Sequence, residues 1–106
     1  MLHMIVNTHN AESCAFRGAD EGRILTEAFD RLAAGAGEQG VSVEGSWINR
    51  AAHEAFILVN APNANAIEEA LLDAGLVGRT HSRVLSVIPT DDVVVDTDAR
   101  VAELAR

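Results

Sequence analysis

The sequence predicts an α+β domain in which a four-stranded antiparallel sheet carries two helices on one of its faces. Short apolar runs rich in strand-forming residues alternate with two longer runs of helical periodicity. Along the chain their order is strand, helix, strand, strand, helix, strand. The length of 106 residues, 48% of them hydrophobic, is enough for one core but not for two domains.

The first strand is expected over residues 2–8, where side chains alternate between two faces. One face carries the apolar set that we expect to pack under the helices, namely Leu2, Met4 and Val6. The other is expected to look outward from the uncovered side of the sheet, with His3, Ile5, Asn7 and His9. A loop over residues 10–19 holds Cys14. Asp20 is expected to cap the helix that follows, because its carboxylate can accept free backbone N–H groups.

That first helix ends in a glycine-rich stretch, and two strands follow over residues 41–48 and 52–60, joined by a polar turn typical of a hairpin. Pro62 ends the second of them. Asn63 is expected to cap a helix that runs to Ala74 and stops at Gly75. A last strand is expected over residues 82–88. In the tail we expect a strand-like stretch at 93–95 and then a helix at 98–104.

This order of elements is that of the ferredoxin-like βαββαβ plait, whose right-handed crossovers place both helices on one face of the sheet. We expect residues 1–89 to form this domain, and 90–106 to form an extension packed on it or on a dimer partner. A bare sheet face with Ile5, Phe56 and Leu58 would lower solubility, so we expect two copies to pack face to face as a homodimeric α/β barrel.

Charge and hydropathy restrict the partners. Sixteen Asp and Glu against eight Arg, with no Lys, give a net charge of −8, which argues against nucleic acid and anionic membranes as partners. No run approaches the roughly 20 apolar residues of a membrane span, and no secretory signal is recognisable. We therefore expect a cytoplasmic protein. The single cysteine, Cys14, agrees with a reducing compartment because it has no partner for an internal disulfide.

One stretch carries a resemblance to a known family. It comprises Val43-Glu44-Gly45-Ser46-Trp47, the apolar run at 55–60, the segment Ala61-Pro62-Asn63-Ala64-Asn65-Ala66-Ile67, and His81. This pattern resembles small bacterial nickel-binding proteins of the dimeric α/β-barrel superfamily. The resemblance implies a homodimer with metal held by His and Cys side chains. The longer first loop and the acidic tail depart from that family, and the pattern does not fix which residues are ligands.

Four histidines and one cysteine are the available nitrogen and sulfur ligands. His9 ends the first strand and His81 begins the last, which we expect beside it and antiparallel. Cys14 follows His9 by five residues. We therefore predict that His9, Cys14 and His81 hold nickel, zinc or copper. With the third strand taken as parallel to the first, the secondary candidates His3 and His53 are expected at the opposite end.

Other interpretations stay open at this stage. Asn7 and Asn60 are expected to add polar edges to the cavity and to contact a cofactor. Cys14, flanked by Ala15 and Phe16, could instead be a small buried hydrophobe, and the histidines ordinary surface or structural residues. The chain could also be a cavity enzyme, a small-molecule oxygenase or one using haem or thiol chemistry, or a ligand-binding dimer without catalysis. No catalytic triad or phosphate-binding loop decides whether it is an enzyme.

Overall fold

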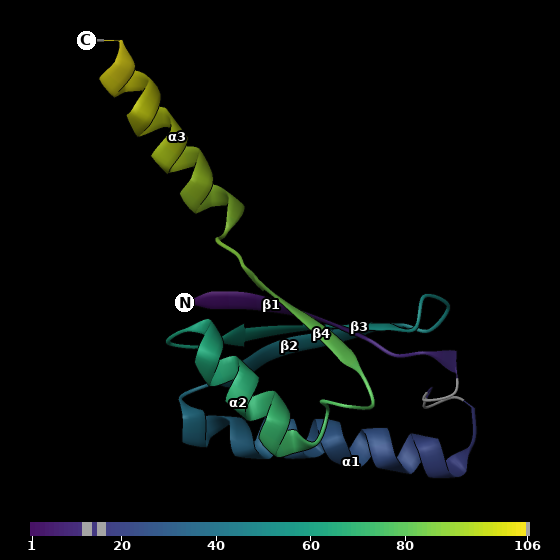
Figure 1. Ribbon diagram of the computed structural model, residues 1–106. Helices are drawn as coiled ribbons and strands as arrows, with labels where there is room; N and C mark the ends of the chain where they lie inside the picture. Colours follow the sequence, from purple (N-terminus) through teal and green to yellow (C-terminus); the bar gives the residue numbers. More distant parts are fainter. Residues whose placement is uncertain (12–13, 15–16, 106) are drawn as a thin grey trace.

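The computed structural model is an α+β fold with a four-stranded antiparallel sheet (Figure 1). It describes residues 1–11, 14 and 17–105. In chain order the elements are β1 (Leu2–Thr8), α1 (Ala19–Gly35), the short 3-10 helix η2 (Ala36–Gln39), β2 (Ser42–Asn49), β3 (Glu54–Asn60), α2 (Ala64–Ala74), β4 (His81–Ser86) and α3 (Thr90–Leu104). The strands lie in the order β2-β3-β1-β4, each antiparallel to its neighbours, which is compatible with the ferredoxin-like plait.

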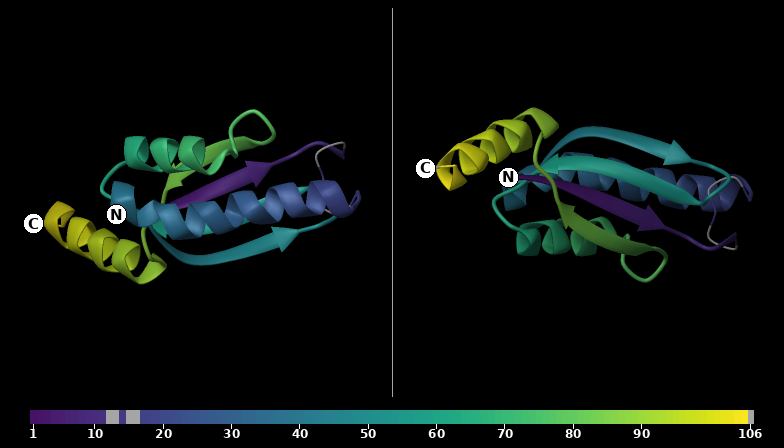
Figure 2. Two further views of the ribbon diagram at one scale, coloured as in Figure 1. Left: turned by 90° about the horizontal axis from the view of Figure 1, so that it is seen from below. Right: turned by 90° about the horizontal axis from the view of Figure 1, so that it is seen from above.

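The core lies between the sheet and two helices that cover the same face. Figure 2 shows α1 and α2 in front of the sheet from below, and the strands uncovered from above. Both helices bury residues at spacings of three, four and seven, the period of one helical face. The buried cluster includes Leu25, Ala28 and Leu32 of α1, Ile67, Ala70, Leu71 and Ala74 of α2, and Ile5, Ile57 and Val59 of the sheet.

The two faces of β1 are the reverse of the prediction. Ile5 is fully buried against the helices, and His3 and Asn7, on the same face, are only 4% and 1% exposed. Leu2, Met4 and Val6 therefore point to the uncovered face. The prediction was wrong because alternation shows which side chains share a face, but not which of the two faces the helices cover.

Local capping signals are confirmed in α2. The Asn63 side chain accepts a hydrogen bond from the Ala66 N–H at 2.8 Å, and Gly75 ends the helix with φ at 79° in the left-handed region. The Arg31 guanidinium of α1 donates to the Ala74 carbonyl at 3.0 and 3.1 Å and so ties the two helices together. Asp20, expected as a cap, lies instead in the first turn of α1, where its charge still favours the helix dipole.

The tail differs from the expected strand followed by a helix. Residues 90–104 form the single helix α3, with Asp91 and Asp92 in its first turn, where acidic side chains stabilise a helix. Figure 1 shows α3 extending away from the sheet, which agrees with a longest dimension of 62 Å. Packing of this helix on a partner remains a prediction. Across the part of the chain that the structure describes, every helix is too short or too polar to cross a membrane.

Candidate metal site

Two histidines and the cysteine meet at one corner of the fold, where β1 ends and β3 begins. His9 follows the last residue of β1, Cys14 lies in the loop beyond it, and His53 precedes β3. Each offers one ligand atom, and the three atoms lie within 4.8 Å of one another. Ala15 and Phe16, considered above as apolar neighbours of Cys14, lie outside the described residues.

His53 reaches this corner because β3 runs antiparallel to β1, with Glu54 opposite Thr8 in the register. The residue before Glu54 therefore lies beside the residue after Thr8, which is His9. The expectation that His53 lies at the opposite end was wrong, since it took the two central strands as parallel. In a plait, the first and second strands are parallel and a hairpin joins the second to the third, so the third strand is antiparallel to the first. This signal could have identified His53 from the sequence.

Backbone hydrogen bonds hold His53 in place. The His9 N–H donates to the His53 carbonyl at 3.1 Å, which continues the pairing of β1 and β3 by one step. In the turn before it, the Asn49 side chain accepts from the Ala52 N–H at 3.0 Å. His53 itself has φ at 55°, and it is the one residue other than glycine with positive φ in the described part of the chain. Such backbone strain clusters at functional sites.

Two ring nitrogens at this corner have no hydrogen-bond partner among the residues that the structure describes. His9 Nε2 and His53 Nδ1 are both buried and unpaired in the structure. The two rings meet edge to face, with centroids 5.2 Å apart. A buried polar atom without a partner costs about 1 to 3 kcal/mol, so two of them on neighbouring rings need an explanation. A bound cation that accepts both lone pairs would supply one.

The protonation state of His9 agrees with a ligand role. Burial, together with the neighbouring His53, lowers the pKa of His9 from its usual value of 6.5. The neutral imidazole is the form that binds a metal, since protonation removes the lone pair. His9 is therefore ready to coordinate at neutral pH.

The three candidate ligand atoms lie slightly farther apart than the ligand atoms around a bound zinc ion. Tetrahedral zinc with bonds of about 2.0 to 2.3 Å holds its ligand atoms roughly 3.3 to 3.6 Å apart. The observed limit of 4.8 Å therefore requires an approach of about 1 Å. Rotation of the side chains about their χ angles is sufficient for such a movement.

Cys14 is buried, with 6% of its surface exposed, yet it is not part of the hydrophobic core cluster. Its neighbours across the described residues include the histidine ligand atoms. Its sulfur thus lies within 4.8 Å of a ring nitrogen of each of two histidines, a setting in which a thiol can serve as a metal ligand.

His81 lies beside the corner but outside the group. It is opposite Thr8 in the register of β1 and β4, as the predicted strand order requires. Partners in a ladder point to the same face, and His9 comes one residue after Thr8, so His81 and His9 point to opposite faces. His81 is also exposed. His3 lies at the other end of β1, as expected, with Nδ1 3.3 Å from the Met1 carbonyl oxygen.

The two asparagines occupy separate places. Asn7 is buried, and its Nδ2 donates to Thr80 Oγ1 at 2.8 Å and to Ser82 Oγ at 2.9 Å. Asn60 accepts a hydrogen bond from the N-terminal ammonium group at 2.8 Å. Asn60 lies opposite Leu2, at the other end of β1 from Asn7, because the two strands are antiparallel. The two side chains therefore do not border one cavity.

Two hollows flank the candidate ligands. One, of about 560 Å³, is lined by Cys14 and His53 together with Ala11, Arg17, Arg50 and Ala51. The other, of about 450 Å³, is lined by His9 together with Thr8, Asn10, Gly78, Arg79, Thr80 and His81. A metal held by the three side chains would therefore lie between two solvent-accessible spaces.

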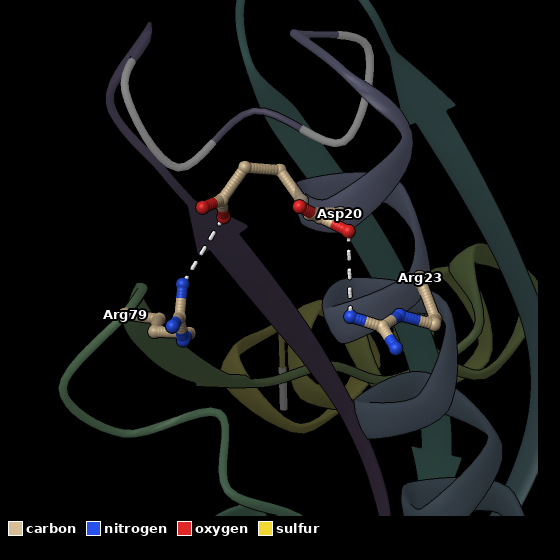
Figure 3. A network of polar contacts seen from close by, with 4 residues as sticks. Asp20, Arg23 and Arg79 are labelled. Carbon is tan, nitrogen blue, oxygen red and sulfur yellow. Dashed lines mark hydrogen bonds and ion pairs between the residues drawn. The ribbon is translucent and has the colours of Figure 1, made fainter.

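One ion pair attaches the start of α1 to this region, and a second lies within α1. Arg79, which lines the hollow beside His9, pairs with Glu21 at 3.1 Å, and Arg23 pairs with Asp20 at 3.4 Å (Figure 3). The first pair joins α1 to the loop before β4. Exposed pairs of this kind contribute little stability, and only the Arg79–Glu21 pair links α1 to the loop beside His9.

Comparison of the chain with family models, with curated proteins and with solved structures gave no match.

Proposed function

We propose that this protein binds a transition-metal ion through His9, Cys14 and His53. The observation that carries the proposal is the pair of buried, unpaired ring nitrogens on two adjacent histidines, in one group with a buried thiol. Two imidazoles and one thiolate form a donor set suited to nickel, zinc or copper. The lowered pKa of His9 supports the proposal, because a neutral ring competes well for a cation at neutral pH.

The test is metal binding by protein that carries no histidine tag. Metal-free protein is titrated with Ni²⁺, Zn²⁺ and Cu²⁺ in separate calorimetric experiments, and the loaded protein is analysed for its metal content. We expect one ion per chain, and competition between the ions identifies the preferred metal. The His9→Ala, Cys14→Ser and His53→Ala variants should each lose stoichiometric binding, because three ligands are the minimum for a stable site of this kind.

His81→Ala is the matched control, since it removes an imidazole next to the site without removing a member of the group. It should bind metal as the wild-type protein does. Equal loss in His81→Ala and His53→Ala would contradict this ligand assignment. Unchanged binding in all four variants, or none in the wild type, would refute the proposal.

We also propose that the protein is a homodimer. Two apolar surfaces of the single chain lack a partner among the described residues. On the uncovered sheet face Trp47 and Leu85 are 58% and 42% exposed. On α3 four apolar side chains fall within a sector of about 100°, one side of the helix. These are Val93, Val94, Val101 and Leu104, all exposed. A second copy would cover both surfaces, as small domains with a bare sheet face commonly require.

Sedimentation equilibrium tests the dimer. Val94→Asp and Leu85→Asp should each shift the wild-type dimer toward monomer, because each buries a charge in the proposed interface. Ala99→Asp adds the same charge on the opposite side of α3 and should leave the dimer intact. A monomeric wild type would refute the proposal, as would dissociation by Ala99→Asp alone.

A further inference from the structure

The outer edge of β4 presents backbone groups that no other strand uses. β4 lies at one end of the sheet (Figure 2), and within the described part of the chain it pairs with β1 alone. The Val87 N–H donates to the Leu2 carbonyl at 3.1 Å, one step beyond this ladder. In an antiparallel pair, the N–H and C=O groups of every second residue point to the partner strand. The residues between them turn these groups outward, namely Ser82, Val84 and Ser86.

The two edges of the sheet differ in how readily they can accept another strand. The pairing of β2 with β3 shifts register between Val43 and Gly45, an irregularity of the kind that natural edge strands use against pairing with other chains. The register of β4 on β1 runs without a shift from His81 to Ser86. A regular edge of this kind is a template for one more strand.

A hollow of about 620 Å³ lies along the same edge, between α2 and β4. Ser82 and Val84, whose backbone groups point outward, both line it. Its wall also includes Leu72 and Val77, two large apolar side chains that are 54% and 57% exposed. Strand edges that bind peptides combine main-chain hydrogen bonds with pockets of this kind for alternate side chains.

Two carboxylates give the hollow a preference for positive charge. Glu68 and Glu69 of α2 both line it, and both are exposed. A basic side chain that entered the hollow would therefore lie near them. An apolar side chain would instead contact Leu72 and Val77.

We propose that an extended peptide segment of a partner protein binds this edge as an additional strand, antiparallel to β4, with basic and apolar side chains in the hollow. Peptide residues opposite Ser82 and Val84 would share a face with them, since cross-strand partners point the same way. That face is the one covered by helices, because Ser82 lies opposite the buried Asn7 in the register. Alternate side chains of the peptide would thus enter the hollow beside α2.

The charges favour such a peptide over a second copy of β4. Antiparallel pairing of two β4 strands about a two-fold axis would place both α2 helices on one side of the joined sheet. Glu68 and Glu69 of each copy would then line a shared groove, and like charges across it would oppose the pairing. A basic peptide has the complementary charge, and the net charge of −8 favours its approach. The dimer proposed above uses the uncovered sheet face and α3, not this edge.

The probe is the capped peptide acetyl-Thr-Lys-Thr-Val-Thr-Lys-Thr-amide, whose Lys and Val side chains share one face of an extended strand. It is titrated into the isotope-labelled full-length protein, and amide hydrogen exchange is measured by NMR with and without it. We expect saturable binding. The outward N–H groups of Ser82, Val84 and Ser86 should exchange more slowly in the complex, whereas those of Arg83 and Leu85, which already point to β1, should change little.

Altered peptides separate the two parts of the recognition. A peptide with Glu in place of both Lys residues should bind more weakly than the original, because it reverses the charge beside α2. An N-methyl group on the central Val removes a backbone donor and should also weaken binding.

Variants of the protein test the same parts. Ser86→Pro removes one outward donor, as edge strands tolerate, and should weaken the affinity by about fivefold. Glu68→Gln and Glu69→Gln should each weaken it by up to about fivefold, the effect of one exposed ion pair. Glu27→Gln removes an exposed carboxylate of α1 that does not line the hollow, and should bind the peptide as the wild type does.

The exchange pattern of the wild type decides the proposal even if Ser86→Pro fails to fold. The absence of saturable binding at about 1 mM peptide would refute it, as would binding that slows inward and outward amides of β4 equally. Outward amides that are already protected in the free protein, increasingly so at higher protein concentration, would assign the edge to a second copy and also refute it. None of these outcomes depends on the metal site.

Discussion

Replacement of His53 by glycine should separate two effects of this residue, namely the backbone strain at its positive φ and the imidazole that it offers to a metal. His53 has φ at 55°, where an L-residue with a Cβ atom is strained by roughly 1 to 2 kcal/mol. Glycine relieves that strain, but it also makes the unfolded chain more flexible, at a cost of about 0.4 to 1 kcal/mol. The metal-free His53→Gly protein should therefore be as stable as the wild type, or more stable by up to about 1.5 kcal/mol.

Metal should affect the two proteins differently. At a metal concentration 100 times the dissociation constant, binding stabilises the wild type by about 2.7 kcal/mol. For a domain of this size that raises the melting temperature by about 11 °C, at roughly 4 °C per kcal/mol. Loss of a ligand should weaken binding at least about 100-fold, since loss of an outer-shell partner alone costs 10- to 100-fold. At the same metal concentration the variant should gain only about 0.4 kcal/mol, or about 2 °C.

Thermal unfolding with and without Zn²⁺, followed by circular dichroism, measures both effects. His53→Ala is the matched control, because it also removes the imidazole but keeps a Cβ atom at positive φ. It should lose the metal response without the gain in stability, so its metal-free melting temperature should lie below that of His53→Gly. If His53→Gly retains the full metal-induced shift, His53 is not a ligand. If His53→Gly melts below His53→Ala, the account of backbone strain is wrong.

Two further predictions concern stability. Because the pKa of His9 is lowered in the fold, the unfolded chain binds more protons as the pH falls through about 6.5, and the free energy of unfolding falls with it. Urea unfolding of the metal-free proteins at about pH 7.5 and pH 5.5 should show the wild type losing stability relative to His9→Gln, and an unchanged difference would contradict the cause given for the shift. Asn63→Ala removes the cap of α2 and should cost about 1 kcal/mol, or about 4 °C, in thermal unfolding. Asn65→Ala, an exposed substitution of the same type within α2, should not destabilise, and equal losses in the two variants would refute the capping role.

Local signals in the sequence predicted most of the elements, because caps and turns depend on a few adjacent residues. Asn63 and Gly75 mark the ends of α2 as expected. The orientation of β1 could not be predicted in the same way. Asn7 lies on the buried face because Thr80 and Ser82, which are distant in sequence, offer hydroxyl groups to its side chain. A polar residue on the covered face is predictable only when its partners are known.

The candidate site was predictable only in part, because local sequence places some of its residues and the arrangement of the strands places the others. His9 and Cys14 are close in sequence, and the loop after β1 brings them together without further information. His53 depends on the direction of β3, and the exclusion of His81 depends on which face a strand-end residue takes. A shift of one residue in a strand reverses the direction of its side chain. The pairing of neighbouring strands therefore places His81 near the site, but its side chain points to the opposite face from His9.

The corner of His9, Cys14 and His53 combines two local features that cost stability. One is a positive φ at a residue with a side chain, and the other is a pair of buried ring nitrogens without partners. Either alone would be an isolated cost to stability. Both fall on residues that share a single group of ligand atoms, and a metal ion would use the ring orientation that the strained backbone creates and satisfy the nitrogens. Backbone strain and unpaired buried atoms that occur together are typical of a functional site, because selection for function retains features that lower stability.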